Sequence, residues 1–423
     1  MKKILLIIFG TFLVISNSNA ESFNAALSKA FKNNSELNAE RENINISVQE
    51  YKISQGNYLP TVTLSGSKSS EDTNKLTNQS GGDATINDVD PLTKSISITQ
   101  TLIDFGRGAE LSKNKIGLEL AKAKLLKKEQ DILYKTTEAY TSLVLANEKL
   151  QINTDNVELL SRQVETDQIR VERGQITLSD VSQSESSLAE AQAKLIQAKN
   201  ELLTNKLNYE NIIGPLTDPK SLNKKTINEY PLPENLDSAI EISKKNNPDL
   251  IIAKLEYEQA QKDKTIAKSD LAPSANLSIE RSYTDDLSAT YDEREKDTLK
   301  ATVTWPFYSG GKNLASINKS SSLETRFRLI LDSVTKKNQT NVASAWSSYQ
   351  SNKSLLNSVQ AQVRAAEIAN EGISAEYNSG AGRTTLEVIQ SNSLLLNAQI
   401  SLADSERNFI LSQFNLLKSI GLL

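Results

Sequence analysis

Hydrophobic residues recur at every seventh position through a long stretch that follows a short alternating segment. Residues 95–102 alternate polar and apolar side chains apart from Gln100, which is typical of a strand with one apolar and one polar face. The segment 104–108 interrupts this pattern. Apolar residues then recur at every seventh position in two registers. The first register consists of Leu111, Leu118, Leu125, Ile132, Ala139 and Ala146, and the second, shifted register consists of Leu143, Leu150, Val157, Val164 and Val171. This pattern predicts a coiled-coil helix over 107–172, about 100 Å long at ~1.5 Å per residue.

The chain contains an internal duplication. Residues 24–37 match residues 237–250 at a constant offset of 213, and at the same offset Pro60 falls on Pro273. Further along the offset changes with loop length, but 102–106 still parallels 306–310, and Gly214 parallels Gly421. We therefore expect one structural unit written twice.

Each copy predicts the same order of elements: a short helix, a medium helix ending before a proline, two strands around a polar loop, a long helix, a glycine turn and a returning helix. The predicted ranges are 22–33, 36–57, 61–69, 94–103, 107–172 and 178–212 in the first copy, and 235–246, 249–270, 274–283, 297–307, 311–377 and 384–419 in the second. The expected domains are 1–20, a signal peptide; 21–214, the first repeat; 215–234, a linker; and 235–423, the second repeat.

The four predicted strands are the only segments after the signal peptide that we expect to cross a membrane. After the signal peptide, no apolar run approaches the ~20 residues of a membrane helix, whereas strands of about ten residues can cross a bilayer when tilted. Four strands cannot close a barrel, and open strand edges are not tolerated in lipid, so several chains must contribute. The alternative is a soluble sheet that covers the end of a coiled-coil bundle.

Composition argues against several function classes. The chain has no histidine and no cysteine, which removes the commonest catalytic bases, thiol nucleophiles and zinc ligands. We therefore expect no enzyme, no cofactor and no metal site. The net charge of −4, with lysines and acids interspersed, gives no basic patch for nucleic acid.

This order of elements, occurring twice after a signal peptide that lacks a lipid-attachment cysteine, resembles the TolC family of outer-membrane channel proteins. The resemblance extends from about Ser22 to Leu423. It implies a mainly α fold with a membrane β-barrel portion: a homotrimer whose twelve strands form one barrel in the outer membrane, continuous with a long periplasmic α-helical barrel, each chain being a tandem structural repeat.

The resemblance also implies the function and the partners. Such a protein is a passive exit duct of a tripartite export system, for efflux of small molecules or for type I secretion of proteins. It docks onto a periplasmic adaptor (membrane fusion) protein and onto an inner-membrane transporter driven by ATP or protons, and it contacts outer-membrane lipid. Metal or heme export is a third variant of the same class. The alternative from a different class is a secreted structural coiled-coil surface protein without a pore.

The resemblance places the gate at the two periplasmic helix turns, which carry Gly174, and Gly380 and Gly382. By motif position, Ser179 and Asp180 correspond to the acceptors of a closing latch. Tyr377 and Arg383 correspond to its donors, and an arginine on a carboxylate is a directional contact that can be released.

Two further positions correspond to rings of acids in the throat of the channel. Glu387 keeps the charge and Gln390 does not, so a trimer would have one ring of carboxylates where the family has two. The second turn has one residue more between Gly380 and Glu387 than the first has between Gly174 and Asp180. The sequence therefore does not decide whether Arg383 reaches Asp180. The alternative for all these residues is ordinary capping of the turns.

Overall fold

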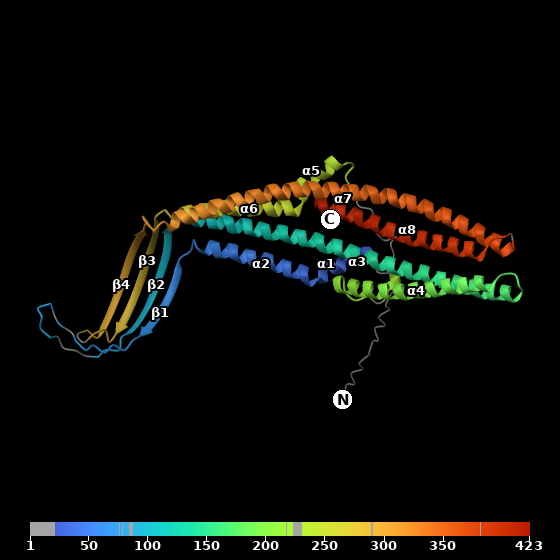
Figure 1. Cartoon of the computed structure of the whole chain (residues 1–423). Helices are drawn as coiled ribbons and strands as arrows, with labels where there is room; N and C mark the ends of the chain where they lie inside the picture. Colours follow the sequence, from blue (N-terminus) through green and yellow to red (C-terminus); the bar gives the residue numbers. More distant parts are fainter. Residues whose placement is uncertain are drawn as a thin grey trace, which may run out of the picture. The chain divides into compact units, whose positions relative to one another are not determined.

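A computed structural model describes residues 22–423 apart from 76, 78, 84–87, 217, 223–230, 289–290 and 381. The predicted signal peptide therefore lies outside the described residues, as does part of the predicted linker. In chain order the elements are α1 (Phe23–Asn33), α2 (Ser35–Gly56), β1 (Thr61–Lys68), β2 (Leu92–Ile103), α3 (Arg107–Glu172), α4 (Leu178–Ile212), the 3₁₀ helix η1 (Pro219–Ser221), α5 (Leu236–Asn246), α6 (Pro248–Ser269), β3 (Ser274–Asp285), β4 (Glu293–Thr304), α7 (Lys312–Ser379) and α8 (Thr385–Ile420) (Figure 1).

The long helices agree with the sevenfold spacing of the sequence, and one strand differs from its prediction. α3 has the predicted bounds, and α7 continues two residues beyond the predicted end, to Ser379. β4 spans Glu293–Thr304 where the sequence predicts 297–307. Pro306 has no N–H for a strand ladder, which favours an earlier end. The charged beginning of β4 is paired with β3, where Arg281 donates to Glu295 at 3.2 Å.

The described residues divide into two compact units. The first unit comprises the residues up to Ser35, 129–239 and 342–423, and the second comprises 36–128 and 240–341. Each unit takes residues from both sequence copies, because α3 and α7 contribute to both.

The second unit holds a four-stranded antiparallel sheet in the order β1-β2-β3-β4, and Figure 1 shows these strands side by side. Its two faces differ in chemistry. One row across the strands is apolar and exposed, formed by Val62, Ile98, Ile279 and Leu299. The adjacent row lies on the opposite face and is polar, formed by Thr63, Ser97, Glu280 and Thr298. The alternation that the sequence predicts is thus carried across all four strands.

The helices of the second unit pack through small residues and ion pairs. The buried residues of α6 include alanine at every seventh position, 253, 260 and 267. Small side chains at this spacing let neighbouring helices approach closely. Gly106 shows the same closeness, because a Cβ at this position would overlap the Ser269 hydroxyl of α6. The ion pairs are Lys128–Glu36, Lys113–Asp263, Lys127–Asp249 and Lys264–Glu324.

The first unit has an aromatic core that joins α1 to three other helices. The Phe23 ring meets Tyr140 of α3 edge-on at 5.3 Å between centroids, and Phe414 of α8 at 5.6 Å. Tyr209 of α4 lies 6.5 Å from Tyr140, and all four side chains are buried. Edge-to-face aromatic pairs of this kind stabilise the fold beyond what the burial of their apolar surface contributes. The short helix α1 is thereby fixed in the bundle.

Candidate functional site

The first helix turn connects α3 to α4 and ends in a capping box. Gly174 has φ of 69°, which favours glycine and lets the chain leave α3. The backbone N–H and the hydroxyl of Thr177 donate to Asp180 Oδ2 at 2.9 and 2.7 Å, and the Asp180 N–H donates to Thr177 Oγ1 at 3.3 Å. The hydrogen bond from the Thr177 side chain, followed by that from its backbone, holds the pKa of Asp180 below its usual value.

The second turn connects α7 to α8 and repeats this cap. Gly380 and Gly382 both have positive φ, at 77° and 84°, and Ala381 between them lies outside the described residues. The Thr384 N–H and hydroxyl donate to Glu387 Oε2 at 2.8 and 3.0 Å, and the Glu387 N–H donates to Thr384 Oγ1 at 3.3 Å. Thr384 and Glu387 thus have the same roles as Thr177 and Asp180. The extra residue of the second turn falls before the cap threonine.

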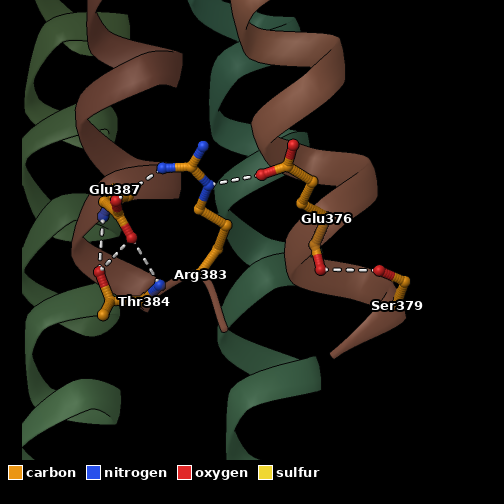
Figure 2. Close-up of polar contacts among 5 residues, drawn as sticks. All are labelled: Glu376, Ser379, Arg383, Thr384 and Glu387. Atoms are coloured by element: carbon orange, nitrogen blue, oxygen red, sulfur yellow. Dashed lines mark hydrogen bonds and ion pairs between the residues drawn. The ribbon is translucent and has the colours of Figure 1, made fainter. Parts of the chain in front are cut away.

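Arg383 adds a pair of salt bridges to the second turn. Its Nε lies 2.6 Å from Glu376 Oε2 on α7, and its Nη1 lies 2.9 Å from Glu387 Oε1 on α8 (Figure 2). The hydrogen bonds to Glu376 and then to Glu387 raise the pKa of Arg383. The backbone hydrogen bond from Thr384, followed by the Arg383 side chain, lowers the pKa of Glu387. These contacts join the end of α7 to the start of α8 within one hairpin.

The structure gives the predicted latch residues separate partners within this chain. Asp180 is bonded to Thr177, and Arg383 is paired with Glu376 and Glu387. Ser179 is exposed on the first turn of α4. Gln390 is exposed three residues after Glu387 on α8, a spacing that puts the two side chains on the same side of the helix. The latch and the acidic throat ring remain predictions.

Tyr377 has a buried partner that the sequence reasoning missed. Its hydroxyl lies 2.7 Å from Asp167 Oδ1 on α3 and 3.0 Å from Thr385 Oγ1 on α8. The Arg170 guanidinium lies 4.2 Å above the Tyr377 ring. Burial is the main cause that raises the pKa of Tyr377. Asp167 has no exposed surface, and Ser184 of α4 donates to its Oδ2 at 2.6 Å.

A signal for Asp167 was present in the sequence. The first register of the long helix continues from Ala146 through Asn153 and Leu160 to Asp167 in steps of seven. All of these positions are buried. A charged residue at a core position of a coiled coil requires partners from the facing helices. The sequence alone could have identified the position, although not the partners.

Across the described part of the chain, no cluster of three or more acidic residues is arranged to hold a metal ion. None of the described helices is both long enough and apolar enough to cross a membrane.

Comparison with known proteins identifies relatives that match nearly the whole chain. The sequence pattern of the outer membrane efflux protein family matches residues 26–215 and 239–422, one segment in each copy. The outer membrane efflux protein BepC of Brucella suis is 25% identical over 414 residues, which cover 97% of this chain and 88% of BepC.

Two solved structures show the same fold at low sequence identity. The outer membrane protein VceC of Vibrio cholerae superimposes with a TM-score of 0.79 at 17% identity, over 94% of this chain and 96% of VceC. The outer membrane channel MtrE of Neisseria gonorrhoeae, solved in its open state, gives a TM-score of 0.77 at 17% identity, over 95% of this chain and 89% of MtrE.

Proposed function

This chain belongs to the outer membrane efflux protein family and is an outer-membrane exit duct that extends into the periplasm, and we propose that three copies form one channel opened at its periplasmic helix turns. The chain is accordingly a transport protein.

The observation that carries this proposal is the two-faced sheet in the second unit. Its apolar row, which includes Val62 and Leu299, suits lipid, and its polar row, which includes Thr63 and Thr298, suits a water-filled interior. The order β1-β2-β3-β4 leaves one edge of β1 and one edge of β4 for pairing with other chains. Because unpaired edges are not stable in lipid, β4 of one protomer would pair with β1 of the next. Three chains then give a barrel of twelve strands.

On β3 and β4, the apolar face of the sheet becomes charged toward the hairpin loops. Ile279 and Leu299 are paired in the apolar part, and Arg281 and Asp297 are paired two rows further on, on the same face. In that row β1 and β2 still carry the apolar Leu64 and Ile96. We place this row near the edge of the hydrocarbon layer, because charges on the lipid face are tolerated near the interface and costly at the midplane. In the proposed orientation, the loops face outward and the long helices extend into the periplasm.

The gate is proposed at the two turns, where Ser179 and Asp180 of α4 approach Tyr377 and Arg383 when the channel is closed. Glu387 lines the throat as one ring of three carboxylates, with Gln390 as an uncharged position next to it. A periplasmic adaptor and an inner-membrane transporter driven by ATP or protons would open this end. The transporter determines whether small molecules or proteins are exported.

Conductance in a planar bilayer tests the channel itself. The purified full chain should insert as a trimer, shown by chemical crosslinking, and give a discrete unit conductance. A trimer without any unit conductance would contradict the proposal and favour a structural protein without a pore.

The latch predicts the behaviour of one double variant. Asp180→Ala with Arg383→Ala should raise the closed-state conductance and the leakage of large antibiotics into cells, because two charge-assisted contacts between the hairpins are lost. The matched control is Lys194→Ala with Glu190→Ala, which removes a 2.7 Å pair further along α4. An unchanged conductance in the first variant would exclude the latch.

A further inference from the structure

Four helices of the second unit lie in a row that ends at α2 and α7. Ion pairs join each neighbouring couple: α2 to α3 through Glu36–Lys128, α3 to α6 through Lys113–Asp263, and α6 to α7 through Lys264–Glu324. The order is therefore α2-α3-α6-α7, as Figure 1 shows, and it follows the strand order β1-β2-β3-β4. The ends of the row of helices and the edges of the sheet thus belong to the same parts of the chain.

The two medium helices of this row differ in how much of their surface is covered. Both have 22 residues. α6 lies inside the row and buries Pro248, Leu250 and three alanines, whereas the buried residues of α2 are Leu37 and Ser54. Ile46 of α2 is 55% exposed. One side of α2 therefore offers apolar surface to a further helix.

The internal duplication indicates which helix would cover this side. α6 is the repeat equivalent of α2 at an offset of 213, and α7 is the equivalent of α3 at an offset of 206, which is the offset between Gly174 and Gly380. Four positions are buried in both long helices at this offset: Ile132, Thr136, Ala139 and Asn153 recur as Asn338, Val342, Ala345 and Val359. α3 contacts the medium helix of its own copy and that of the other copy. For α7 the second of these neighbours would be α2 of another protomer.

One ion pair of the α3–α6 contact is repeated in the sequences of α7 and α2. Lys113 Nζ lies 2.6 Å from Asp263 Oδ1. The repeat equivalents are Lys319 of α7 and Glu50 of α2, so both the cation and the acid are retained. Lys319 and Glu50 are exposed, and neither has an ion pair among the described residues. The same charge pair is thus present on two helices that lie at opposite ends of the row.

The other ion pair of the α3–α6 contact is not repeated. Lys127 lies 2.6 Å from Asp249, and the repeat equivalents are Ser333 and Glu36. Glu36 is already paired with Lys128 of its own chain. A contact between α7 and α2 would therefore depend on a single repeated ion pair for its register.

A neighbouring pair of residues changes from polar to apolar between the two copies. Gly117 of α3 lies next to Gln259 of α6, because a Cβ at position 117 would be 3.2 Å from the Gln259 Nε2. The repeat equivalents are Leu323 of α7 and the exposed Ile46 of α2. Interfaces between identical chains are more apolar than the remaining surface. This exchange therefore suits a contact between protomers.

We propose that α7 of each protomer packs along α2 of the next, held in register by an ion pair between Lys319 and Glu50 of the next protomer, and that this contact closes the helical wall of the duct beside the membrane. The inference rests on the proposed trimer. Pairing of β4 with β1 of the next protomer brings the same parts together, because α7 follows β4 and α2 precedes β1. The contact joins two different surfaces, and repeated by rotation it closes a ring of three.

Crosslinking between introduced cysteines tests this contact directly, because the chain has no cysteine of its own. The test variant is Glu50→Cys with Lys319→Cys, and the purified full chain is treated in detergent with a short bismaleimide. We expect covalent dimers and trimers on a denaturing gel. The matched control is Lys113→Cys with Asp263→Cys, which should react within one chain and give monomers. Monomers alone from the test variant would overturn the proposal.

Charge reversal tests the ion pair itself. Glu50→Lys or Lys319→Glu places like charges opposite each other at every contact, so we expect each to lower the fraction of trimer severalfold at low salt, and less at high salt. Light scattering after size exclusion measures this fraction. The combined variant exchanges the two charges and should restore the wild-type fraction, and Lys115→Glu, at an exposed position of α3, is the control that should not change it. A combined variant with no more trimer than the single variants would overturn the ion pair.

Failure of this proposal and failure of the channel proposal give different results. A trimer that conducts but forms no crosslink between positions 50 and 319 would keep the channel and overturn the helix contact. A crosslinked trimer without unit conductance would support the helix contact and contradict the channel.

Discussion

The second helix turn and the Asp167 network use similar groups in opposite environments. At the turn, Arg383 pairs with Glu376 and Glu387 in contact with water (Figure 2). In the network, Asp167 has no exposed surface and is bonded to hydroxyl groups of neighbouring helices. Exposed pairs contribute little to stability and are screened by salt. Buried carboxylates lose their solvation and therefore depend on every partner. Burial, more than formal charge, thus decides which contact holds the helices.

The largest effect is expected when the buried carboxylate is removed. Asp167→Ala leaves the donors Ser184, Tyr377 and Gln163 without their acceptor in the bundle. Unpaired buried donors cost ~1–3 kcal/mol each, and we expect a loss of about 3 kcal/mol in the free energy of unfolding. Denaturant unfolding in detergent measures it, with Asp155→Ala as the exposed control. A loss equal to that of the control would remove the distinction between the two regions.

A capping threonine should have an intermediate effect. Thr177→Ala removes the side chain that accepts from the Asp180 N–H and donates to the Asp180 carboxylate. Loss of a threonine cap costs ~1 kcal/mol, and the same unfolding experiment should show it. Ser182→Ala, at an exposed position of α4, is the control and should leave the free energy unchanged. Equal values for both variants would mean that the cap does not stabilise the turn.

Acid should destabilise the two helix caps by less than the Thr177→Ala substitution does. The folded-state pKa values of Asp180 and Glu387 are lowered, so their ionised forms stabilise the turns above the unfolded pKa of ~4. This contribution is lost as the pH falls through the lowered values. Protection of 177–181 and 384–388 against hydrogen exchange, corrected for intrinsic rates, should fall between about pH 5 and pH 2. Thr177→Ala should reduce this pH dependence in the first turn alone, because the hydroxyl bond is lost and the backbone N–H of residue 177 still donates to Asp180; an unchanged dependence would assign it to other groups.

The smallest effect is expected at Arg383. Arg383→Gln should leave the melting temperature unchanged at any salt concentration, because both of its ion pairs are exposed. Scanning calorimetry at low and high sodium chloride measures this. A fall of several degrees that disappears at high salt would show that the exposed pairs contribute as much as the buried network. Conductance is a separate property, so a latch role of Arg383 is compatible with this result.

The two regions also differ in how far the sequence predicts them. Threonine followed three residues later by an acid indicates a helix start, and both caps lie where the long helices begin again. The Asp167 network involves residues of four helices that are more than 200 positions apart at the extremes. No local pattern could have paired Tyr377 with Asp167, because the neighbours of a core position depend on how the helices pack.

The strands also differ in how far the sequence predicts them. β1 begins at Thr61, as the sequence predicts after Pro60, because proline and alternation are local signals. The charged start of β4 has no alternation, and the sequence predicts a loop there. It forms a strand because Glu295 and Asp297 lie opposite Tyr283 and Arg281 of β3. Such cross-strand pairs exist only once the hairpin has formed.

By itself, the sequence determined the duplication, the long helices, the turns and the family of this protein, because heptad spacing, prolines and glycines act over short distances and are repeated in order. The tertiary structure decided which polar groups meet. It joined Asp167, Ser184, Tyr377 and Thr385 in a buried network and left Arg383 in exposed pairs within its own hairpin. The physical reason is that the strength of a polar contact depends on its exposure to water, and exposure is a property of the packed helices.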